Sequence, residues 1–242
     1  MQSISGENSA TAATGSPCDD CDIRDLAICG ALRAEEVQRL TGILSSVELA
    51  AGDPIVDEGE AADYVYTLTT GAVRLYKLLA DGRRSVTGFL FPGDFLGVSH
   101  RDAYGFGAEA ITPVTLCRFP RSKLEALLKE IPTLEHRLFA RASEEMTLMQ
   151  EQIVLLGRKT AAERVASFFR GLSARQVKRH LPANPVSVPM TRTDIADYLG
   201  LTTETVSRTI TQLKKKKLIS VEHGSRVRIE DEEQLDELAE AL

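Results

Sequence analysis

The chain has 242 residues, of which 43% are hydrophobic and 26% charged, with a formal net charge of -6 at pH 7. This composition is that of an ordinary soluble globular protein with one or two domains, and no apolar run is long enough to span a bilayer. The acidic total argues only weakly against nucleic acid, because the distribution of charge matters more than its sum.

The first 17 residues are rich in Ser, Thr, Ala and Gly and contain no Lys, Arg or hydrophobic segment. They lack the features of a secretory signal or a transit peptide, so we expect a disordered tail in a cytoplasmic protein.

Four cysteines follow an uneven pattern. Cys18, Cys21 and Cys29 cluster after the tail, and Cys117 lies far along the chain. In a cytoplasmic protein this pattern suggests a metal centre more than disulfides. The spacing suits zinc as well as an iron–sulfur cluster, and a thiol switch remains open. Taken singly, each could equally be a core or solvated residue without a ligand role.

Short apolar runs alternate with Gly- and Asp-containing turns from about residue 49 to 119. The strand-like runs are residues 54–56, 64–68, 72–76, 86–90 and 114–119. Several short strands at this spacing predict an antiparallel sandwich or roll.

A helix-length stretch follows from about residue 121 to 157, with Pro132 marking a break or a first-turn position. Apolar residues recur in it at alternating spacings of four and three: Ala142, Met146, Met149, Ile153 and Leu156. This is the seam pattern of paired helices, although the stripe could instead pack only on the roll. A two-fold dimer also suits a protein that reads a palindrome, so dimerisation is the favoured interpretation.

A further helix is expected from residue 160 and a short strand at 186–189. Residues 192–211 then read as two short helices around a tight turn at Gly200, which can take a positive φ. The second helix buries Val206, Ile210 and Leu213. Its outer face keeps short polar groups and one guanidinium: Thr203, Glu204, Ser207, Arg208 and Thr211. An ordinary helical hairpin would favour long solvated charges there, so we predict a helix-turn-helix that reads the DNA major groove.

Basic residues surround this unit, seven from residue 208 to 228 against Glu222 alone. Lys214 begins a run of four lysines that suits a phosphate backbone, although a solvated helix end is the alternative. Apolar runs on both sides of residues 223–225 predict a hairpin, or wing. The last thirteen residues are acidic, and we expect a closing helix away from the DNA.

Roll, long helix and winged helix-turn-helix, in this order, resemble the Crp/Fnr family of bacterial transcription regulators from residue 18 to 229. The most specific motif is Glu204-x-x-Ser207-Arg208, which resembles the Fnr branch's reading residues for half-sites of the form TTGAT. Arg208 can donate bidentately to guanine, Glu204 can accept from a cytosine amine, and Ser207 can approach a thymine or a phosphate.

The resemblance implies an α+β fold: an N-terminal antiparallel β-roll (jelly roll), a long dimerisation helix and a C-terminal winged helix-turn-helix. We expect a tail and cysteine segment at 1–30, the roll as sensor domain at 31–130, the dimerisation helix at 131–158 and the DNA-binding domain at 159–242.

Fnr-type regulators hold an oxygen-labile 4Fe-4S cluster on three N-terminal cysteines and one from the roll. The resemblance therefore implies that Cys18, Cys21, Cys29 and Cys117 hold such a cluster. Four aspartates crowd these thiols and should lower the potential or stability of an anionic cluster: Asp19, Asp20, Asp22 and Asp25.

Other members of the family bind a cyclic nucleotide through a Gly-Glu pair and an Arg-Ser or Arg-Thr pair. Here Val98 follows Gly97, and Ala108-Glu109 stands about where Arg-Ser would. Glu109 would repel a phosphate, although Arg101 lies nearby, so we expect no cyclic nucleotide.

Residues 80–84 resemble the surface by which these regulators touch RNA polymerase, with a plain charged hairpin as the alternative. No nucleophile–base pair or phosphate-cradling loop indicates an enzyme. An iron–sulfur electron carrier is the rival from another class, but it would have no use for a recognition helix.

Overall fold

A β-roll forms the N-terminal half of the protein. The computed structural model describes residues 18, 21–97, 102–223 and 225–240. Within that part of the chain, the roll has two antiparallel four-stranded sheets, ordered β1-β8-β3-β6 and β2-β7-β4-β5. The strands are β1 (Ser45–Leu49), β2 (Pro54–Val56), β3 (Tyr64–Thr70), β4 (Val73–Leu78), β5 (Arg84–Leu90), β6 (Phe95–Leu96), β7 (Gly107–Ala110) and β8 (Val114–Pro120). The predicted antiparallel roll is confirmed, and the expected tail lies outside the described residues.

Two hydrophobic cores stabilise this half. Leu68, Val73 and Leu116 pack between the sheets. A second core lies at the end of the roll, where β8 meets three helices: the short 3-10 helix η1 (Ile28–Ala31), α1 (Ala34–Thr41) and α2 (Arg121–Glu130). Burial of apolar surface holds these helices on the sheet and places the N-terminal cysteine segment beside Cys117.

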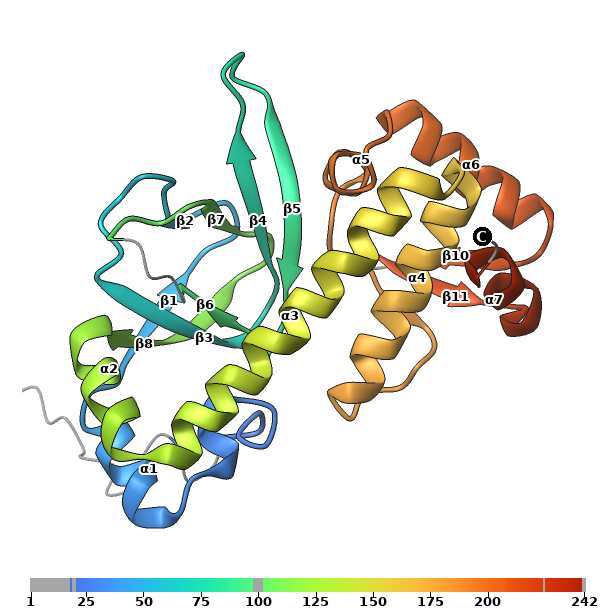
Figure 1. Ribbon diagram of the computed structural model, residues 1–242. Helices are drawn as coiled ribbons and strands as arrows, with labels where there is room; N and C mark the ends of the chain where they lie inside the picture. The colour runs from blue at the N-terminus through green and yellow to red at the C-terminus, as the bar shows by residue number, and fades with distance from the viewer. Residues whose placement is uncertain (1–17, 19–20, 98–101, 224, 241–242) are drawn as a thin grey trace, which may run out of the picture.

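The long helix α3 (Pro132–Arg158) runs from the roll to the C-terminal half (Figure 1). Pro132 occupies its first turn, where a missing N–H costs nothing. Leu134 is buried near one end and Leu155 near the other, so each end is anchored in a different core.

The C-terminal half is a winged helix-turn-helix. Its elements are α4 (Ala161–Lys178), β9 (Val186–Ser187), α5 (Arg192–Leu199), α6 (Thr203–Lys215), β10 (Ile219–Glu222), β11 (Arg226–Ile229) and α7 (Glu232–Glu240). Thr160 and Glu163 form a capping box that starts α4. The acidic α7 packs against α4, where Arg170 pairs with Asp236. Among the described residues, no helix is both long and apolar enough to cross a membrane.

Candidate nucleic-acid interface and candidate metal centre

A tight turn joins α5 to α6, as the sequence predicts. Gly200 takes a left-handed conformation with φ +60°, which a residue without Cβ adopts at no steric cost. The Thr202 hydroxyl then accepts a hydrogen bond from the Thr205 N–H at 3.1 Å and caps α6. Val206 and Ile210 are buried, which fixes the face that α6 turns to its own core.

The opposite face of α6 is exposed. Glu204, Ser207 and Arg208 are three and four residues apart and therefore share one edge of the helix. Thr211 and Lys214 continue the exposed surface, while Thr203 is half-buried in the first turn. Among the described residues Arg208 has no ion pair, so its guanidinium is available to a ligand. The assignment of these six residues to DNA contacts remains a prediction.

The Glu204 carboxylate lies at the start of α6. Hydrogen bonds from its own backbone N–H and from the Thr202 hydroxyl lower the pKa of this carboxyl. The partial positive charge of a helix N-terminus favours the same ionised form. Glu204 therefore faces solvent as a hydrogen-bond acceptor, which is the form that a cytosine amine requires.

The wing is the antiparallel hairpin of β10 and β11. Arg228 donates to Glu222 at 2.6 Å across the hairpin, whereas Arg226 is exposed. The lysines at 214–217 are also exposed: the first two lie in the last turn of α6, and the other two lie between α6 and the wing. Positive charge on α6 and on the wing thus lies beside the exposed edge formed by Glu204, Ser207 and Arg208. Gly224 at the wing tip lies outside the described residues.

The structure brings the four cysteines together. Cys117 lies on β8, opposite Ser46 of β1 and Thr67 of β3. Cys18 is buried in the core at the end of the roll, and Cys29 of η1 and Cys117 pack against that core. Cys21 is half-buried, and its C=O accepts from the Arg24 N–H at 3.1 Å.

The neighbouring thiols also affect one another's pKa. Burial, followed by repulsion from the thiols of Cys18 and Cys21, raises the pKa of Cys29 to about 11. Burial and the other three thiols raise the pKa of Cys117 to about 12. The thiols of Cys29 and Cys117 are therefore protonated near neutral pH, and a metal that binds them must displace their protons. In the described part of the chain, no three Cys, His, Asp or Glu residues converge on a point that would hold a single metal ion.

Gly30 allows the backbone of the cysteine segment to fold closely on itself. The sequence reasoning did not identify this residue. A Cβ at this position would lie 2.5 Å from the Arg24 carbonyl oxygen and 2.9 Å from the Asp25 Cα. The backbone at residues 24–25 therefore folds directly against residue 30. Only glycine allows this approach, which keeps Cys21 and Cys29 in one compact turn.

The cysteine segment is docked on α3. Arg137 donates to the Asp25 carbonyl at 2.7 Å, and Arg141 donates to the Leu26 carbonyl. The Asp25 carboxylate bonds instead to His180 Nε2 at 2.7 Å, which lowers the pKa of that carboxyl. Of the four aspartates expected to crowd the thiols, Asp25 is thus engaged by a histidine, and Asp19 and Asp20 lie outside the described residues.

Comparison with known proteins gives concordant matches for both halves. Residues 46–131 match the cyclic nucleotide-binding domain family, and residues 163–238 match the Crp-like helix-turn-helix domain family. The transcriptional activatory protein AadR of Rhodopseudomonas palustris is 41% identical over 232 residues, covering 96% of this chain and 97% of that protein. The chain belongs to the Crp/Fnr family.

Two further relatives agree. The nitrogen fixation regulation protein FixK of Bradyrhizobium diazoefficiens is 40% identical over 207 residues, covering 86% of this chain and 87% of that protein. The solved structure of FixK2 from Bradyrhizobium japonicum is 36% identical with a TM-score of 0.77, covering 83% of this chain and 99% of that one. Crp/Fnr proteins are DNA-binding transcription regulators that act as dimers, not enzymes, and this chain is a DNA-binding regulator of that type.

The apolar stripe on α3 is exposed in the single chain. Met146 is 63% exposed, Met149 57% and Ile153 70%, while Ala142 and Leu156 are also exposed. The alternative that the stripe packs only on the roll is therefore wrong. Phe139, which is 71% exposed, extends the alternating spacing by one step toward the roll. The sequence reasoning missed Phe139, although its position three residues before Ala142 continues the same pattern.

Glu109 is turned toward arginines within the roll. It lies on β7, and its carboxylate binds Arg74 of β4 and, at 3.4 Å, Arg84 of β5. The match to the cyclic nucleotide-binding family describes the fold of this domain. Because Val98 and Arg101 lie outside the described residues, the absence of a cyclic nucleotide remains a prediction.

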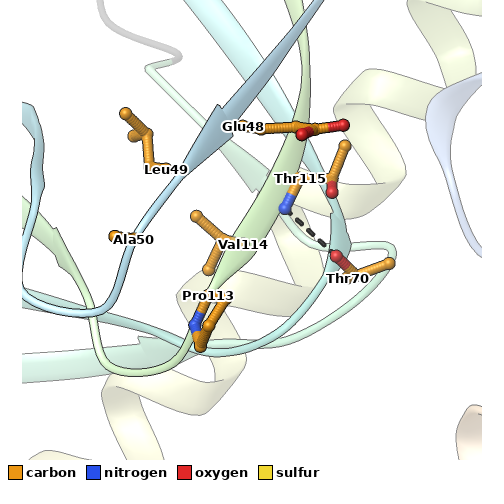
Figure 2. Close-up of a pocket in the computed structure, with 7 residues that line it drawn as sticks. All are labelled: Glu48, Leu49, Ala50, Thr70, Pro113, Val114 and Thr115. Atoms are coloured by element: carbon orange, nitrogen blue, oxygen red, sulfur yellow. Dashed lines mark hydrogen bonds between the residues drawn. The ribbon is translucent and has the colours of Figure 1, made fainter.

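A hollow of about 340 Å³ opens at one end of β1 and β8 (Figure 2). Figure 2 shows its lining of mostly uncharged residues, among them Leu49 and Val114, and the hydrogen bond that the Thr115 N–H donates to the Thr70 hydroxyl, which is 3.1 Å long. Glu48 supplies the charged side chain of its lining. The residues that line it include no Lys, Arg or His that would neutralise a bound phosphate.

Proposed function

We propose that this protein is an Fnr-type regulator that senses oxygen in the cytoplasm through a 4Fe-4S cluster. The cluster would be held by Cys18, Cys21, Cys29 and Cys117, and it would control dimerisation and binding to TTGAT-type palindromes. The gathering of four half-buried or buried thiols at one end of the roll is the observation that carries this proposal.

Four cysteine thiols are a suitable set of ligands for a 4Fe-4S cluster. Iron–sulfur clusters are held by cysteine thiolates, and a four-iron cluster takes four of them. Zinc needs all its sulfurs about 2.3 Å from a single ion, which is a tighter arrangement than one thiolate for each iron. When bound, the cluster would supply the oxygen-sensitive link between residues 18–29 and β8.

The protein's own contacts suggest how that link reaches α3. Arg137 and Arg141 of α3 donate to backbone carbonyls of the cysteine segment. A segment tied to Cys117 would hold these carbonyls in place and fix the start of α3. Loss of the tie would free the segment and weaken the pairing of two α3 helices, which carry the exposed stripe.

Anaerobic purification followed by an absorption spectrum and iron and sulfide analysis tests the proposal. We expect about four irons and four sulfides per chain, as the cluster formula requires. Air should bleach the spectrum and lower affinity for a TTGAT palindrome. Cys117→Ser should lose the metal, whereas Ser46→Ala, opposite Cys117 on β1, should keep it.

Other results would identify the alternatives. Zinc without sulfide would favour a zinc site, and metal-free protein whose DNA affinity follows thiol oxidation would favour a thiol switch. Either result would overturn the cluster while leaving the DNA-binding function in place. A cluster without binding to a TTGAT palindrome would contradict the proposed target sequence, because the family match already identifies a DNA-binding regulator.

We also propose that the tip of the β4–β5 hairpin contacts RNA polymerase. The hairpin projects from the roll (Figure 1), and Leu78 and Leu79 are 59% and 43% exposed. Arg84 is engaged with acids of this chain, so the free surface of the predicted loop is residues 80–83. Substitution of Leu79 by Ser should reduce transcription activation without changing operator affinity, and an equal loss of both would contradict this role.

A further inference from the structure

A partly buried group of four charges connects the helix-turn-helix to the β-roll of its own chain, and Asp194 is its fully buried member. Asp194 of α5 is 0% exposed, and its Oδ1 accepts from Arg74 at 3.1 Å and from Arg84 at 3.4 Å. The same two guanidiniums bind Glu109. We call Arg74, Arg84, Glu109 and Asp194 the charge quartet. Its two positive and two negative charges balance, which buried ions require.

Asp194 has a second task within the helix-turn-helix. Its Oδ2 accepts from the Thr191 N–H at 3.0 Å and from the Thr191 hydroxyl at 2.6 Å, which completes the capping box of α5. Oδ2 therefore caps the N-terminus of α5, and Oδ1 binds the two arginines of the roll. A rotation of the unit away from the roll would separate the Asp194 carboxylate from both guanidiniums and leave those two positive charges on the roll with Glu109 alone.

Ring contacts and hydrogen bonds to its backbone also hold α5 against the roll, α3 and α4. The Tyr198 ring lies 5.1 Å from the Phe89 ring of β5 and 5.9 Å from the Phe168 ring of α4, measured between centroids. Gln152 of α3 donates to the Tyr198 carbonyl at 2.8 Å. Arg164 of α4 donates to the Leu199 carbonyl at 2.9 Å. The direction of α5 is thus set by the roll, α3 and α4 together.

The direction of α5 determines that of α6, because the two helices pack around Gly200. In a dimer formed through the stripe on α3, the separation and tilt of the two α6 helices then depend on how α5 sits on α3 and the roll. Half-site spacing in helix-turn-helix dimers follows this geometry.

We infer that the charge quartet sets the half-site spacing that the protein accepts, with Arg74 and Asp194 acting as positioning residues that do not touch DNA. The inference rests on the proposed dimeric reading of TTGAT half-sites. It goes beyond that proposal, because it assigns spacing selectivity to residues inside the chain and base selectivity to the outer edge of α6.

Arg74→Gln in the full-length protein tests the inference, since it breaks the quartet from the roll side and leaves the Thr191–Asp194 cap intact. Fluorescence anisotropy measures the affinity for duplexes in which two TTGAT half-sites are moved apart in single base-pair steps. We expect the unaltered protein to prefer one spacing by about 10-fold or more, near one turn of DNA. In Arg74→Gln that preference should fall about fivefold, with affinity for an isolated half-site unchanged within about twofold.

Two further variants make the result decisive. Asp194→Asn keeps a capping side chain on α5 but removes the charge, and it should flatten the spacing profile in the same way. Lys77→Gln is the matched control, because Lys77 lies on the same strand as Arg74 but its side chain is 47% exposed and pairs with Glu58, outside the quartet. It should keep the original profile. Thermal melting of each variant establishes that it is folded.

An unchanged spacing profile in folded Arg74→Gln and Asp194→Asn would overturn the inference. So would a loss of affinity that is equal at every spacing, because it would indicate a purely structural role. Failure of the unaltered protein to recognise TTGAT half-sites at all would contradict the proposed function instead, so the two failures are distinguishable.

Discussion

Arg208 and Lys214 lie on the same helix but offer different chemistry to DNA. A guanidinium can make two hydrogen bonds to one guanine, whereas an ammonium can pair with a phosphate but does not by itself distinguish bases. Both side chains are exposed, so neither is needed to hold the fold. We therefore expect substitutions of Arg208 and of Lys214 to separate base recognition from electrostatic attraction to DNA.

Arg208→Ala should abolish specific binding while leaving weak, salt-dependent association. Loss of one bidentate pair costs about 1–3 kcal/mol of discrimination for each base pair. Lys214→Ala is the matched contrast, and it should weaken binding to operator and random duplexes alike and reduce the salt slope by about one. Anisotropy titrations on both duplexes at several salt concentrations measure these effects. Equal losses on the two duplexes for Arg208→Ala would contradict a base-reading role.

Gly30→Ala should disturb the cysteine segment. The new methyl group would meet backbone atoms at 2.5 and 2.9 Å, and forcing such a group into a packed site typically costs about 1–3 kcal/mol. We expect a lower melting temperature and a lower iron content after anaerobic purification. Gly105→Ala is the control, because a Cβ at Gly105 meets nothing within 4 Å. Full iron content in Gly30→Ala would show that the turn is not required.

At the scale of elements, one face of α3 packs against its own chain and another face is exposed. Leu134 and Leu155 anchor it to the two halves of its own chain, whereas Met146 and Ile153 are left uncovered. An exposed apolar stripe of this kind marks an interaction surface, and its seam spacing matches a second copy of the same helix.

Ile153→Glu should separate the dimer without unfolding the chain. The side chain is 70% exposed in the single chain, but it would be buried in a paired seam, where an unpaired charge costs several kcal/mol. Thr147→Glu adds the same charge at an exposed position outside the seam and should leave the dimer intact. Sedimentation equilibrium decides between these outcomes. A dimer that survives Ile153→Glu would place the subunit interface elsewhere.

At the scale of the whole molecule, the seam has a consequence for the cluster-free protein. Met146, Met149 and Ile153 are apolar, so their burial would stabilise a dimer even without a cluster, at about 25 cal/mol for each Å² buried. We therefore expect partial dimerisation to persist after exposure to air. Gel filtration of the air-exposed protein over a range of concentrations tests this, and a clean monomer at every concentration would contradict it.

Local patterns predicted much of this molecule. The turn at Gly200, the buried stripe of α6 and the break at Pro132 each follow from periodicity or backbone chemistry over a few residues. Three strands were missed for a local reason: β1 has mixed polarity, β6 has two residues, and β7 is built mainly from Gly and Ala. None of them carries an apolar run long enough to stand out.

The contacts between distant segments could not be predicted. Arg74 and Asp194 are 120 residues apart, and no local pattern indicates that they meet. The same holds for His180 and Asp25, which are 155 residues apart. The cysteine pattern suggested a metal centre, but only the family resemblance implied that Cys117 shares one 4Fe-4S cluster with the N-terminal cysteines. The exposed edge of α6 formed by Glu204, Ser207 and Arg208 could be predicted from the sequence, because these residues are neighbours on a single helix.

Affinity for a duplex with both TTGAT half-sites, compared with the same duplex with one half-site scrambled, tests most directly whether two α6 edges read DNA together. For anaerobically purified protein, we expect scrambling one half-site to reduce affinity by about 100-fold or more, toward the level of non-specific binding. Equal affinity for the two duplexes would contradict symmetric reading by a pair of subunits.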